Sequence, residues 1–244
     1  MKVLIIGESC WDEFVYCRVD RLSPEAPVPV MVEVSRKTNE GMAGNVKANL
    51  NSLCCDVVDM ITNKELITKT RFVEIKTNHM VVRLDSNDKV DRCFNIYDVD
   101  LSYYDAIILS DYNKGFLTIE DLMHISNAHP LTFLDTKKPL GLWALGFTYI
   151  KINETEWDNS VKNGALGIDW QDKLIVTLGD RGCDHNGVNY PSEKVPVFDL
   201  SGAGDTFLAG LVYSYLRTKD ISSSIKFANE CAGKVVAKRG VSTL

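Results

Sequence analysis

The sequence lacks the features of membrane, secreted and nucleic-acid-binding proteins. No apolar run approaches the roughly 18 residues that a membrane span requires, and Met1-Lys2 leads directly into the apolar run Val3–Ile6 rather than into a signal peptide. The 27 lysines and arginines are outnumbered by 33 aspartates and glutamates, and they are scattered rather than gathered into a basic stripe. We therefore expect a cytoplasmic protein that binds neither membranes nor nucleic acid.

Cysteine spacing typical of disulfide scaffolds, zinc sites and redox motifs is also missing. The chain has 7 cysteines, an odd number, and its one tight pair, Cys54-Cys55, is adjacent and not of the Cys-x-x-Cys type. We expect all of them to be reduced thiols. Internal repeats, low-complexity tracts and Pro/Gly/Ser-rich linkers are absent as well. A length of 244 residues with 45% hydrophobic and 25% charged residues therefore predicts one globular domain over residues 1–244.

Short apolar runs rich in β-branched residues recur along the chain and alternate with segments of helical periodicity. The runs are Val3–Ile6, Val57–Ile61, Ala106–Leu109, Leu131–Leu134, Thr148–Ile152 and Leu174–Leu178. The helical segments include Gly44–Leu53, Ile119–Ala128, Ala203–Leu216 and Ile221–Lys238. This alternation predicts a three-layer α/β fold, with a mostly parallel central sheet covered on both faces by helices.

Two stretches interrupt the alternation. One is Pro27–Val34, and the other is Thr68–Leu84, in which Arg71–Lys76 and Met80–Leu84 flank the polar turn Thr77-Asn78-His79. Both are typical of antiparallel strands outside the parallel sheet. We expect them to form a small β-strand lid that covers about residues 13–36 and 68–85.

The segment with the clearest chemistry is Asp199–Phe207, a glycine-rich turn that runs into the amphipathic segment Ala203–Leu216. The first N–H groups of a helix lack intrahelical partners and carry the positive end of the helix dipole, so this turn can bind a phosphoryl group, with Asp205 in reach of the attacking group. An ordinary helix cap formed by Ser201 or Asp205 is the alternative. The GxxxxGK[ST] motif of P-loop enzymes does not occur here.

The string DLSGAGDTFLAG at residues 199–210 resembles the C-terminal signature of the ribokinase-like (PfkB) carbohydrate kinases. Residues 41–45 resemble the N-terminal signature of that family, although Met42 stands where a second glycine is common. The resemblance implies the ribokinase-like fold, with ATP and Mg²⁺ as cofactors. It also implies that Asp205 deprotonates a sugar hydroxyl while the amides of Gly202, Ala203 and Gly204 hold the transferred phosphoryl group.

Further strings narrow the resemblance to the D-glycero-β-D-manno-heptose 7-phosphate kinases of bacterial heptose biosynthesis. They are residues 7–12, 21–30, 67–71, 83–85, 109–115 and 240–243. The run SPEAPVPV at residues 23–30 is the most discriminating, and a proline-rich edge strand is its structural alternative. The resemblance implies phosphorylation of the 1-hydroxyl of that heptose phosphate, in the synthesis of ADP-heptose and the lipopolysaccharide core.

The same resemblance assigns residues to the sugar. Sugar hydroxyls would be bound by Asp12, Gly41 and Asn45, with Asp12 expected just past the first strand, where doubly wound sheets place ligands. The phosphate already on the substrate would be bound by Lys69, Arg71 and Arg21, although each could equally be a solvated surface cation. Asp111 and Lys114 follow the run Ala106–Leu109 and are expected at the same edge of the sheet.

Other residues are assigned to the nucleotide by the resemblance. Lys137 follows Asp135-Thr136, where the family has Asp-Pro-Lys, and is expected near the phosphates. The N-x-x-E motif consists of Asn153, Glu154, Thr155 and Glu156, of which Asn153 and Glu156 are candidates to assist a Mg²⁺ held mainly by ATP; its structural alternative is an N-capping asparagine with an acidic first turn. Thr177, Gly179 and Asn229 would line the nucleotide.

One departure from these relatives keeps other functions open. The chain is shorter by a few tens of residues between Thr62 and Leu66. Another PfkB sugar kinase and a shortened, non-catalytic sugar- or nucleotide-binding homologue are therefore alternatives. We also expect no nucleotidyltransferase domain of the kind that some heptose kinases carry, since the sequence ends at Leu244. Because exposed lid strands would be covered by a second copy, we expect a homodimer.

Overall fold

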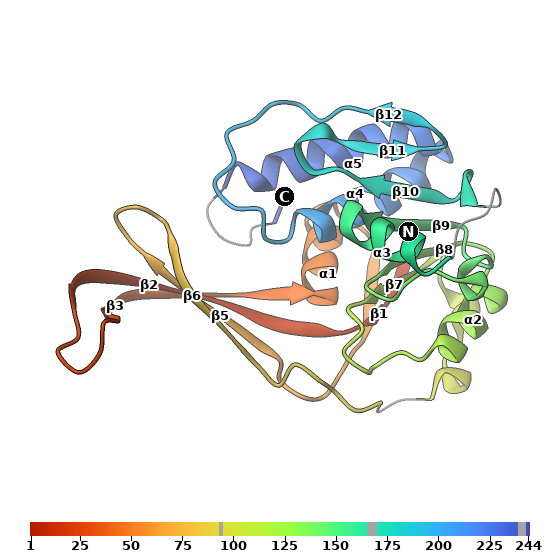
Figure 1. Cartoon of the computed structure of the whole chain (residues 1–244). Helices are drawn as coiled ribbons and strands as arrows, with labels where there is room; N and C mark the ends of the chain where they lie inside the picture. Colours follow the sequence, from red (N-terminus) through yellow and green to blue (C-terminus); the bar gives the residue numbers. More distant parts are fainter. Residues whose placement is uncertain (93–94, 165–169, 239–242) are drawn as a thin grey trace.

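The computed structural model describes residues 1–92, 95–164, 170–238 and 243–244, which form an α/β body with a strand lid projecting from it (Figure 1). The main sheet of this described part has the strand order β12-β11-β10-β9-β8-β7-β1-β4. Its parallel strands are β1 (Lys2–Gly7), β4 (Val57–Ile61), β7 (Ala106–Asp111), β8 (Thr132–Thr136), β9 (Tyr149–Asn153) and β10 (Leu174–Thr177). An antiparallel hairpin of β11 (Cys183–His185) and β12 (Val188–Tyr190) extends one edge.

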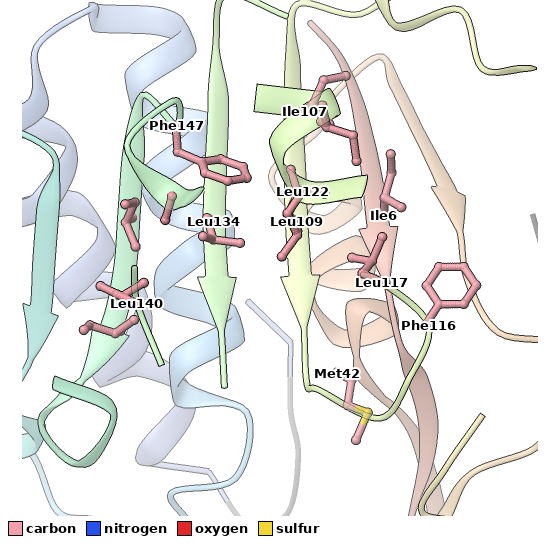
Figure 2. Packing of buried hydrophobic residues seen from close by; sticks show 14 of the residues in the cluster. Ile6, Met42, Ile107, Leu109, Phe116, Leu117, Leu122, Leu134, Leu140 and Phe147 are labelled. Atoms are coloured by element: carbon pink, nitrogen blue, oxygen red, sulfur yellow. The ribbon is translucent and has the colours of Figure 1, made fainter. Parts of the chain in front are cut away.

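Helices cover both faces of this sheet. One face packs against α1 (Ala43–Ser52), α4 (Ala203–Thr218) and α5 (Ile221–Val236), and the other against α2 (Ile119–Ala128) and α3 (Glu154–Lys162). The short 3₁₀ turns are η1 (Ile96–Asp98), η2 (Leu101–Tyr103), η3 (Leu142–Ala144) and η5 (Gly179–Arg181). Strand β1 shows why both faces are apolar. Val3 and Ile5 join the core under α1 and α4, whereas Leu4 and Ile6 join the core under α2. Figure 2 shows Ile6 among the side chains of this second core.

The predicted three-layer fold is therefore confirmed, with small shifts at the element ends. Each of the predicted runs contains a strand, and the helix at Ile119–Ala128 has the predicted bounds. The β11–β12 hairpin was not predicted. Its strands are only 3 residues long, which is too short for a periodicity to be recognised.

The lid is a separate sheet with the order β3-β2-β5-β6. It consists of β2 (Ser9–Leu22), β3 (Pro29–Met42), β5 (Thr68–Glu74) and β6 (Met80–Ser86). It is larger than the predicted 13–36 and 68–85, because β2 and β3 continue as a ribbon down to the body (Figure 1). The prediction of antiparallel pairing is wrong for one pair, since β2 and β5 run parallel.

The shortened connection near Thr62 is closed by a compact set of hydrogen bonds. Asn63 accepts from the amide of Ser9 at 2.8 Å and donates to the carbonyls of Ser9 at 3.2 Å and Glu65 at 2.6 Å. Residues 62–67 thus link β4, at the edge of the main sheet, directly to β5 of the lid. The chain in this region is continuous and hydrogen-bonded despite its short length.

The predictions on membrane spans and on cysteines concern the chain as a whole. In the ranges that the structure describes, no helix is both long and apolar enough to cross a membrane. Cys10, Cys17, Cys54, Cys55, Cys183 and Cys231 are free thiols, as expected, whereas Cys93 lies outside the described residues. Gly240, Val241 and Ser242 of the C-terminal string also lie outside them.

Candidate active site

The glycine-rich turn leads into α4 as the sequence predicted. Gly202 caps the helix with φ 81°, a left-handed conformation that glycine adopts without steric cost, so the chain can turn sharply into the helix. Asp205 lies in the first turn of α4, with a side chain that is almost completely buried, at 5% exposure. The predicted catalytic residues Gly202, Ala203, Gly204 and Asp205 therefore occupy one helix N-terminus, where the first amides of a helix can meet an anion. The Ala203 amide also donates to the carbonyl of Leu200, at 3.3 Å.

Both oxygens of the Asp205 carboxylate accept a hydrogen bond. Asn45 donates to Oδ2 at 3.1 Å, and the Tyr112 hydroxyl donates to Oδ1 at 2.7 Å. Burial raises the pKa of Asp205 to about 6, although the bonds from Tyr112 and Asn45 act in the opposite direction. A carboxylate with a pKa of this kind is ionised at neutral pH and is still basic enough to accept a proton from a hydroxyl group.

Polar and cationic residues from the root of the lid lie beside this base. Buried Asp12 forms an ion pair with Arg71 of β5, and Asp12 pairs with Lys69 in the register of β2 and β5. A Cβ atom at Gly41 would come within 2.1 Å of Asp12 Oδ2, so only glycine allows this approach. The Lys69 ammonium lies 5.1 Å from the ring centre of Tyr112. The structure thus gathers five of the predicted sugar residues, Asp12, Gly41, Asn45, Lys69 and Arg71.

Asp12 lies on a different element from the predicted one. It was expected in the loop just past the first strand, but it lies within β2, the first lid strand. The alternation of buried and exposed residues along β2 points Asp12 inward. The lid therefore forms part of the site.

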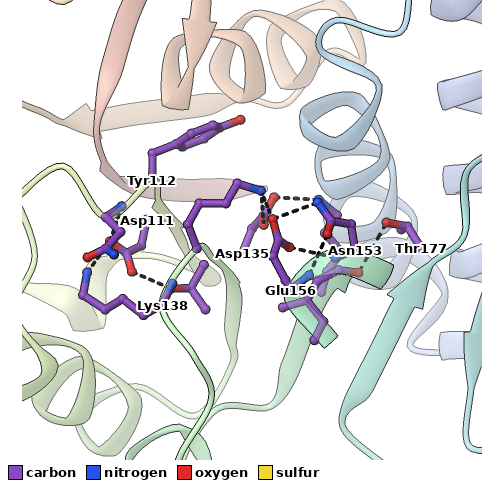
Figure 3. A network of polar contacts seen from close by, with 12 residues as sticks. Asp111, Tyr112, Asp135, Lys138, Asn153, Glu156 and Thr177 are labelled. Atoms are coloured by element: carbon purple, nitrogen blue, oxygen red, sulfur yellow. Dashed lines mark hydrogen bonds and ion pairs between the residues drawn. The ribbon is translucent and has the colours of Figure 1, made fainter. Parts of the chain in front are cut away.

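A second group of charged residues lies at the carboxyl ends of β8 and β9 (Figure 3). Lys137 forms an ion pair with Glu156, and Asn153 donates to Glu156 at 2.8 Å. Burial opposes the charge of Lys137, but nearby Asp135 and Glu156 outweigh it and raise the pKa of the ammonium. Asn153 and Glu156 also form the capping box of α3, so the structural alternative and the predicted grouping are both present.

A buried ion pair lies between this group and α4. Lys151 of β9 contacts Asp135 of β8 at 2.7 Å, and both side chains are buried. The Lys151 ammonium lies against Gly204, so a fixed positive charge is placed beneath the turn that offers its amides. This charge strengthens the turn as an anion site.

A cavity of about 440 Å³ opens on the other side of the glycine-rich turn. Thr177, Gly179 and Asn229 line it together with Ala203 and Gly204, and its apolar wall includes Val195, Val197, Leu200, Phe207 and Val236. This volume and this mixture of apolar wall and few polar groups are typical of small-molecule sites. The three residues predicted for the nucleotide thus share one cavity with the anion site.

Two other predicted nucleotide residues face solvent. Glu154 is exposed and forms an ion pair with Arg181 at 2.6 Å. Thr155 is exposed as well. Within the N-x-x-E motif, Glu156 contacts Lys137, and Asn153 donates to Glu156.

Three predicted substrate residues are not joined to Asp205 by any contact in the described chain. Arg21 is exposed near the outer end of β2, opposite Val30 in the ribbon. Lys114 pairs with Asp88 at 2.6 Å. Asp111 accepts from Thr136 at 2.5 Å and from Lys138 at 2.6 Å, so it connects β7 with the end of β8 (Figure 3).

Sequence reasoning missed Glu8, Tyr112 and Lys151. Glu8 follows directly after the apolar strand β1, which is a place where such sheets position ligands, and Lys151 interrupts an apolar strand. Both signals were present in the sequence. Tyr112 carried no such signal, because its neighbour Asp111 is the residue type expected at a sheet edge.

The oxygen donors of the site fit a hard divalent cation such as Mg²⁺. Asp135 Oδ1 is buried without a hydrogen-bond partner, and Asn153 and Glu156 supply further oxygen atoms nearby. Among the residues described, no group of three or more histidine, cysteine, aspartate or glutamate side chains is placed to hold a metal ion.

Comparisons with known proteins agree with this geometry. A profile described as pfkB family carbohydrate kinase matches residues 42–244. Proteins named bifunctional protein HldE are similar over nearly the whole chain, with 28% identity for Nitratiruptor sp. over 99% of it and 32% for Helicobacter pylori strain J99 over 98%. The chain spans 63% of the length of these curated relatives. The second alignment extends over 297 positions, which exceeds the 244 residues of the chain by 53.

Solved structures show the same fold. Ribokinase from Thermotoga maritima matches 99% of this chain and 94% of its own with a TM-score of 0.73 and 15% identity. Arabidopsis thaliana ribokinase, complexed with ribose and ATP, matches 98% of this chain and 93% of its own with a TM-score of 0.71 and 14% identity. Since the family profile covers most of the chain, including the turn that carries Asp205, the chain belongs to the pfkB family of carbohydrate kinases.

Proposed function

We propose that this protein transfers the γ-phosphoryl group of ATP to the 1-hydroxyl of D-glycero-β-D-manno-heptose 7-phosphate, in the synthesis of ADP-heptose and the lipopolysaccharide core. The observation that carries the proposal is the place of Asp205. It lies between a cation-bearing polar site at the lid root and a nucleotide-sized cavity. This is the arrangement that phosphoryl transfer between a sugar and a nucleotide requires.

The choice of a phosphorylated sugar rests on two observations. Lys69 and Arg71 bring positive charge to the lid root, close to Asp12 and Asn45, whose side chains suit hydroxyl groups. The relatives named HldE are heptose 7-phosphate kinases and ADP-heptose synthases, and strings of this sequence resemble heptose 7-phosphate kinases. We infer that Lys69 and Arg71 bind the 7-phosphate.

The residues of the chain supply the proton transfer and the charge stabilisation. Asp205 accepts the proton of the 1-hydroxyl, and the oxygen forms a bond to the γ-phosphorus while the bond from that phosphorus to the bridging oxygen of ADP breaks. The amides of Gly202, Ala203 and Gly204, with Lys151 beneath them, stabilise the negative charge on the transferred group. Lys137 lies next to Glu156 at the phosphate side. When bound, Mg²⁺ neutralises charge on the nucleotide phosphates.

The first experiment measures ADP release from the purified protein with Mg-ATP and one of four sugars. The sugars are D-glycero-D-manno-heptose 7-phosphate, ribose, fructose and fructose 6-phosphate. We expect turnover only with the heptose phosphate. Turnover confined to another sugar would support a different pfkB sugar kinase, and ATP binding without any turnover would support the non-catalytic homologue.

Asp205→Asn tests the base itself. We expect kcat to fall by about two to four powers of ten, because the amide cannot accept the proton, while ATP binding measured by calorimetry stays close to that of the wild type. Asp220→Asn is the matched control, since Asp220 caps the next helix by accepting from Ser223 at 2.9 Å, and asparagine caps helices equally well. A kcat of Asp205→Asn similar to that of the wild type would overturn the assignment.

A further inference from the structure

The Tyr112 hydroxyl is one of the two side-chain groups that donate to Asp205 in the described part of the chain. Tyr112 lies in the string 109–115 that resembles the heptose 7-phosphate kinases, but the sequence alone assigned it no role. It comes from the loop after β7, whereas Asn45 comes from α1. Its bond of 2.7 Å to Oδ1 is shorter than the 3.1 Å bond of Asn45 to Oδ2. Because the two donors hold different oxygens, together they fix the plane of the carboxylate.

The loop that carries Tyr112 is held by a buried carboxylate. Glu8 is completely buried, and its oxygens accept from the amides of Tyr112 at 2.7 Å, Lys114 at 2.9 Å and Phe116 at 3.2 Å. None of the ion pairs found among the described residues involves Glu8. A buried charge that is stabilised only by backbone amides requires those amides to stay in place.

Glu8 is also connected with the second donor. Its own carbonyl oxygen accepts from the amide of Ala43 at 2.9 Å, at the start of the helix that carries Asn45. One residue at the end of β1 therefore orients both elements from which the donors to Asp205 come. The contact with Ala43 comes from the backbone, whereas the contacts with the Tyr112 loop depend on the Glu8 carboxylate.

The Tyr112 ring lies near two lysine ammonium groups, one from the proposed sugar site and one from the proposed nucleotide site. The Lys69 ammonium, from the lid root, lies 5.1 Å from the ring centre, and the Lys137 ammonium, from the phosphate side, lies 5.3 Å from it. Such cations are attracted to the ring face. The ring thus lies at the boundary between the two proposed binding sites.

From these contacts we propose that Tyr112, oriented by Glu8, is a positioning residue that holds Asp205 as the base of the transfer. The proposal rests on the proposed function, in which Asp205 accepts the sugar proton. The hydroxyl of Tyr112 stabilises the ionised carboxylate of Asp205. The ring of Tyr112 lies between the ammonium groups of Lys69 and Lys137 and keeps them apart. Neither Tyr112 nor Glu8 exchanges a proton with the sugar.

Other charged and titratable groups face Asp205 as well. Asp135 of β8 opposes its ionisation and Lys151 of β9 favours it. Lys137 and, from β2, the Cys10 thiol are also within electrostatic reach. These groups are unchanged when only the Tyr112 hydroxyl is removed, so that hydroxyl can be tested alone.

The test compares Tyr112→Phe with the wild type in two measurements. In the first, ¹³Cγ-aspartate labelling and NMR give the titration midpoint of Asp205, whose signal is assigned by its loss in Asp205→Asn. In the second, the acidic limb of the pH profile of kcat/KM is measured. Removing a hydrogen bond that favours the ionised form should move both to higher pH by about one unit.

Two further variants separate positioning from a general loss of structure. Tyr104→Phe is the matched control, because the Tyr104 hydroxyl donates to exposed Asp59 at 2.9 Å, and it should shift neither quantity. Glu8→Gln keeps one acceptor oxygen but replaces the other with an NH2 donor, so the amides of Tyr112, Lys114 and Phe116 can no longer all be bound. It should therefore loosen the loop and shift the midpoint in the same direction as Tyr112→Phe. The double variant should shift no further than Tyr112→Phe, since both changes act on one bond.

An unchanged midpoint of Asp205 in Tyr112→Phe would overturn the proposal, even if Glu8→Gln fails to fold. A fall in kcat by the same factor at every pH, without a shift of the limb, would also overturn it. The NMR titration needs no turnover. If the wild type phosphorylates no sugar, the proposed function fails while the role of Tyr112 is still decided.

Discussion

At the scale of one residue, the burial of Asp205 affects both its ability to act as a base and the stability of the fold. Its carboxylate is buried at a helix N-terminus, and burial raises its pKa from 3.8 to about 6. A group whose pKa is raised by folding binds its proton more tightly in the native state than in the unfolded state. It therefore stabilises the fold at low pH and loses this contribution as the pH rises through the native pKa.

This linkage gives a pH-dependent prediction for Asp205→Asn, which cannot ionise. Between about pH 4 and pH 6, the free energy of unfolding of the wild type should fall relative to that of the variant by up to about 3 kcal/mol. Urea unfolding of both proteins at pH 4, 5, 6 and 7 measures the difference. A difference that is constant with pH, or that changes in the opposite direction, would contradict the raised pKa.

Met42 is a second residue whose local conformation conflicts with its type. It caps α1 with φ 57° and ψ −130°, a region that favours glycine, and its side chain is buried in the core. Met42→Gly should therefore be more stable than Met42→Ala by about 1 kcal/mol, because glycine relieves the backbone cost and loses only one methyl group more than alanine does. Chemical denaturation measures this order.

Met60 in β4 is the control for this comparison, since it is not among the residues with positive φ. There the order should be the usual one, with Met60→Gly less stable than Met60→Ala. The same order at both positions would show that the conformation of Met42 is not strained.

At the scale of elements, helices α2 and α3 both begin with a capping box, but at different places in the fold. Thr118 and Asp121 form the capping box of α2, and Asn153 and Glu156 form that of α3. Both boxes stabilise a helix start. Only the box of α3 also contacts Lys137, beside the glycine-rich turn.

The two caps can therefore be compared directly. Asn153→Ala and Thr118→Ala should each lower the free energy of unfolding by about 1 kcal/mol, because each leaves helix amides without a partner. Only Asn153→Ala should also lower kcat/KM for ATP, measured by ADP release under varied ATP. Equal kinetics of the two variants would assign Asn153 a purely structural role.

At the scale of the whole molecule, the lid leaves sheet edges and apolar side chains in solvent. Strands β3 and β6 form the two edges of the lid sheet, and Val32, Val34, Met80, Val82 and Leu84 on them are exposed. Exposed edges with apolar residues favour pairing with another chain. A second copy offers matching edges, so the homodimer expected from the sequence remains our proposal.

Sedimentation of the wild type should accordingly give twice the chain mass at micromolar concentration. Val34→Lys combined with Val82→Lys should give the monomer, because charged side chains on both edges oppose pairing. Val161→Lys on the exposed surface of α3 is the matched control and should remain a dimer. A wild-type monomer would contradict the proposal.

The arrangement of the body could be predicted from sequence because buried parallel strands are continuous apolar runs. The fully buried strand β7 contains the predicted run Ala106–Leu109 for this reason, and the helix Ile119–Ala128 has the predicted bounds because its apolar residues recur with helical periodicity. The extent of the lid could not be predicted in this way. Its edge strands β3 and β6 are largely exposed, so their composition is only weakly constrained. The pairing of β2 with β5 depends on contacts between distant segments.

In the candidate site, too, some features depend on local sequence and others depend on tertiary contacts. Local sequence determined the turn at Gly202, the helix that follows it and the presence of Asp205 in its first turn, because these depend on neighbouring residues and on the special conformations of glycine. Only the tertiary structure decided that Tyr112 rather than Asp111 contacts Asp205, and that Glu8 and Lys151 support it. Those contacts join residues that lie between 53 and 104 positions apart in the sequence. A local pattern carries no information on which of two neighbouring side chains will face the site.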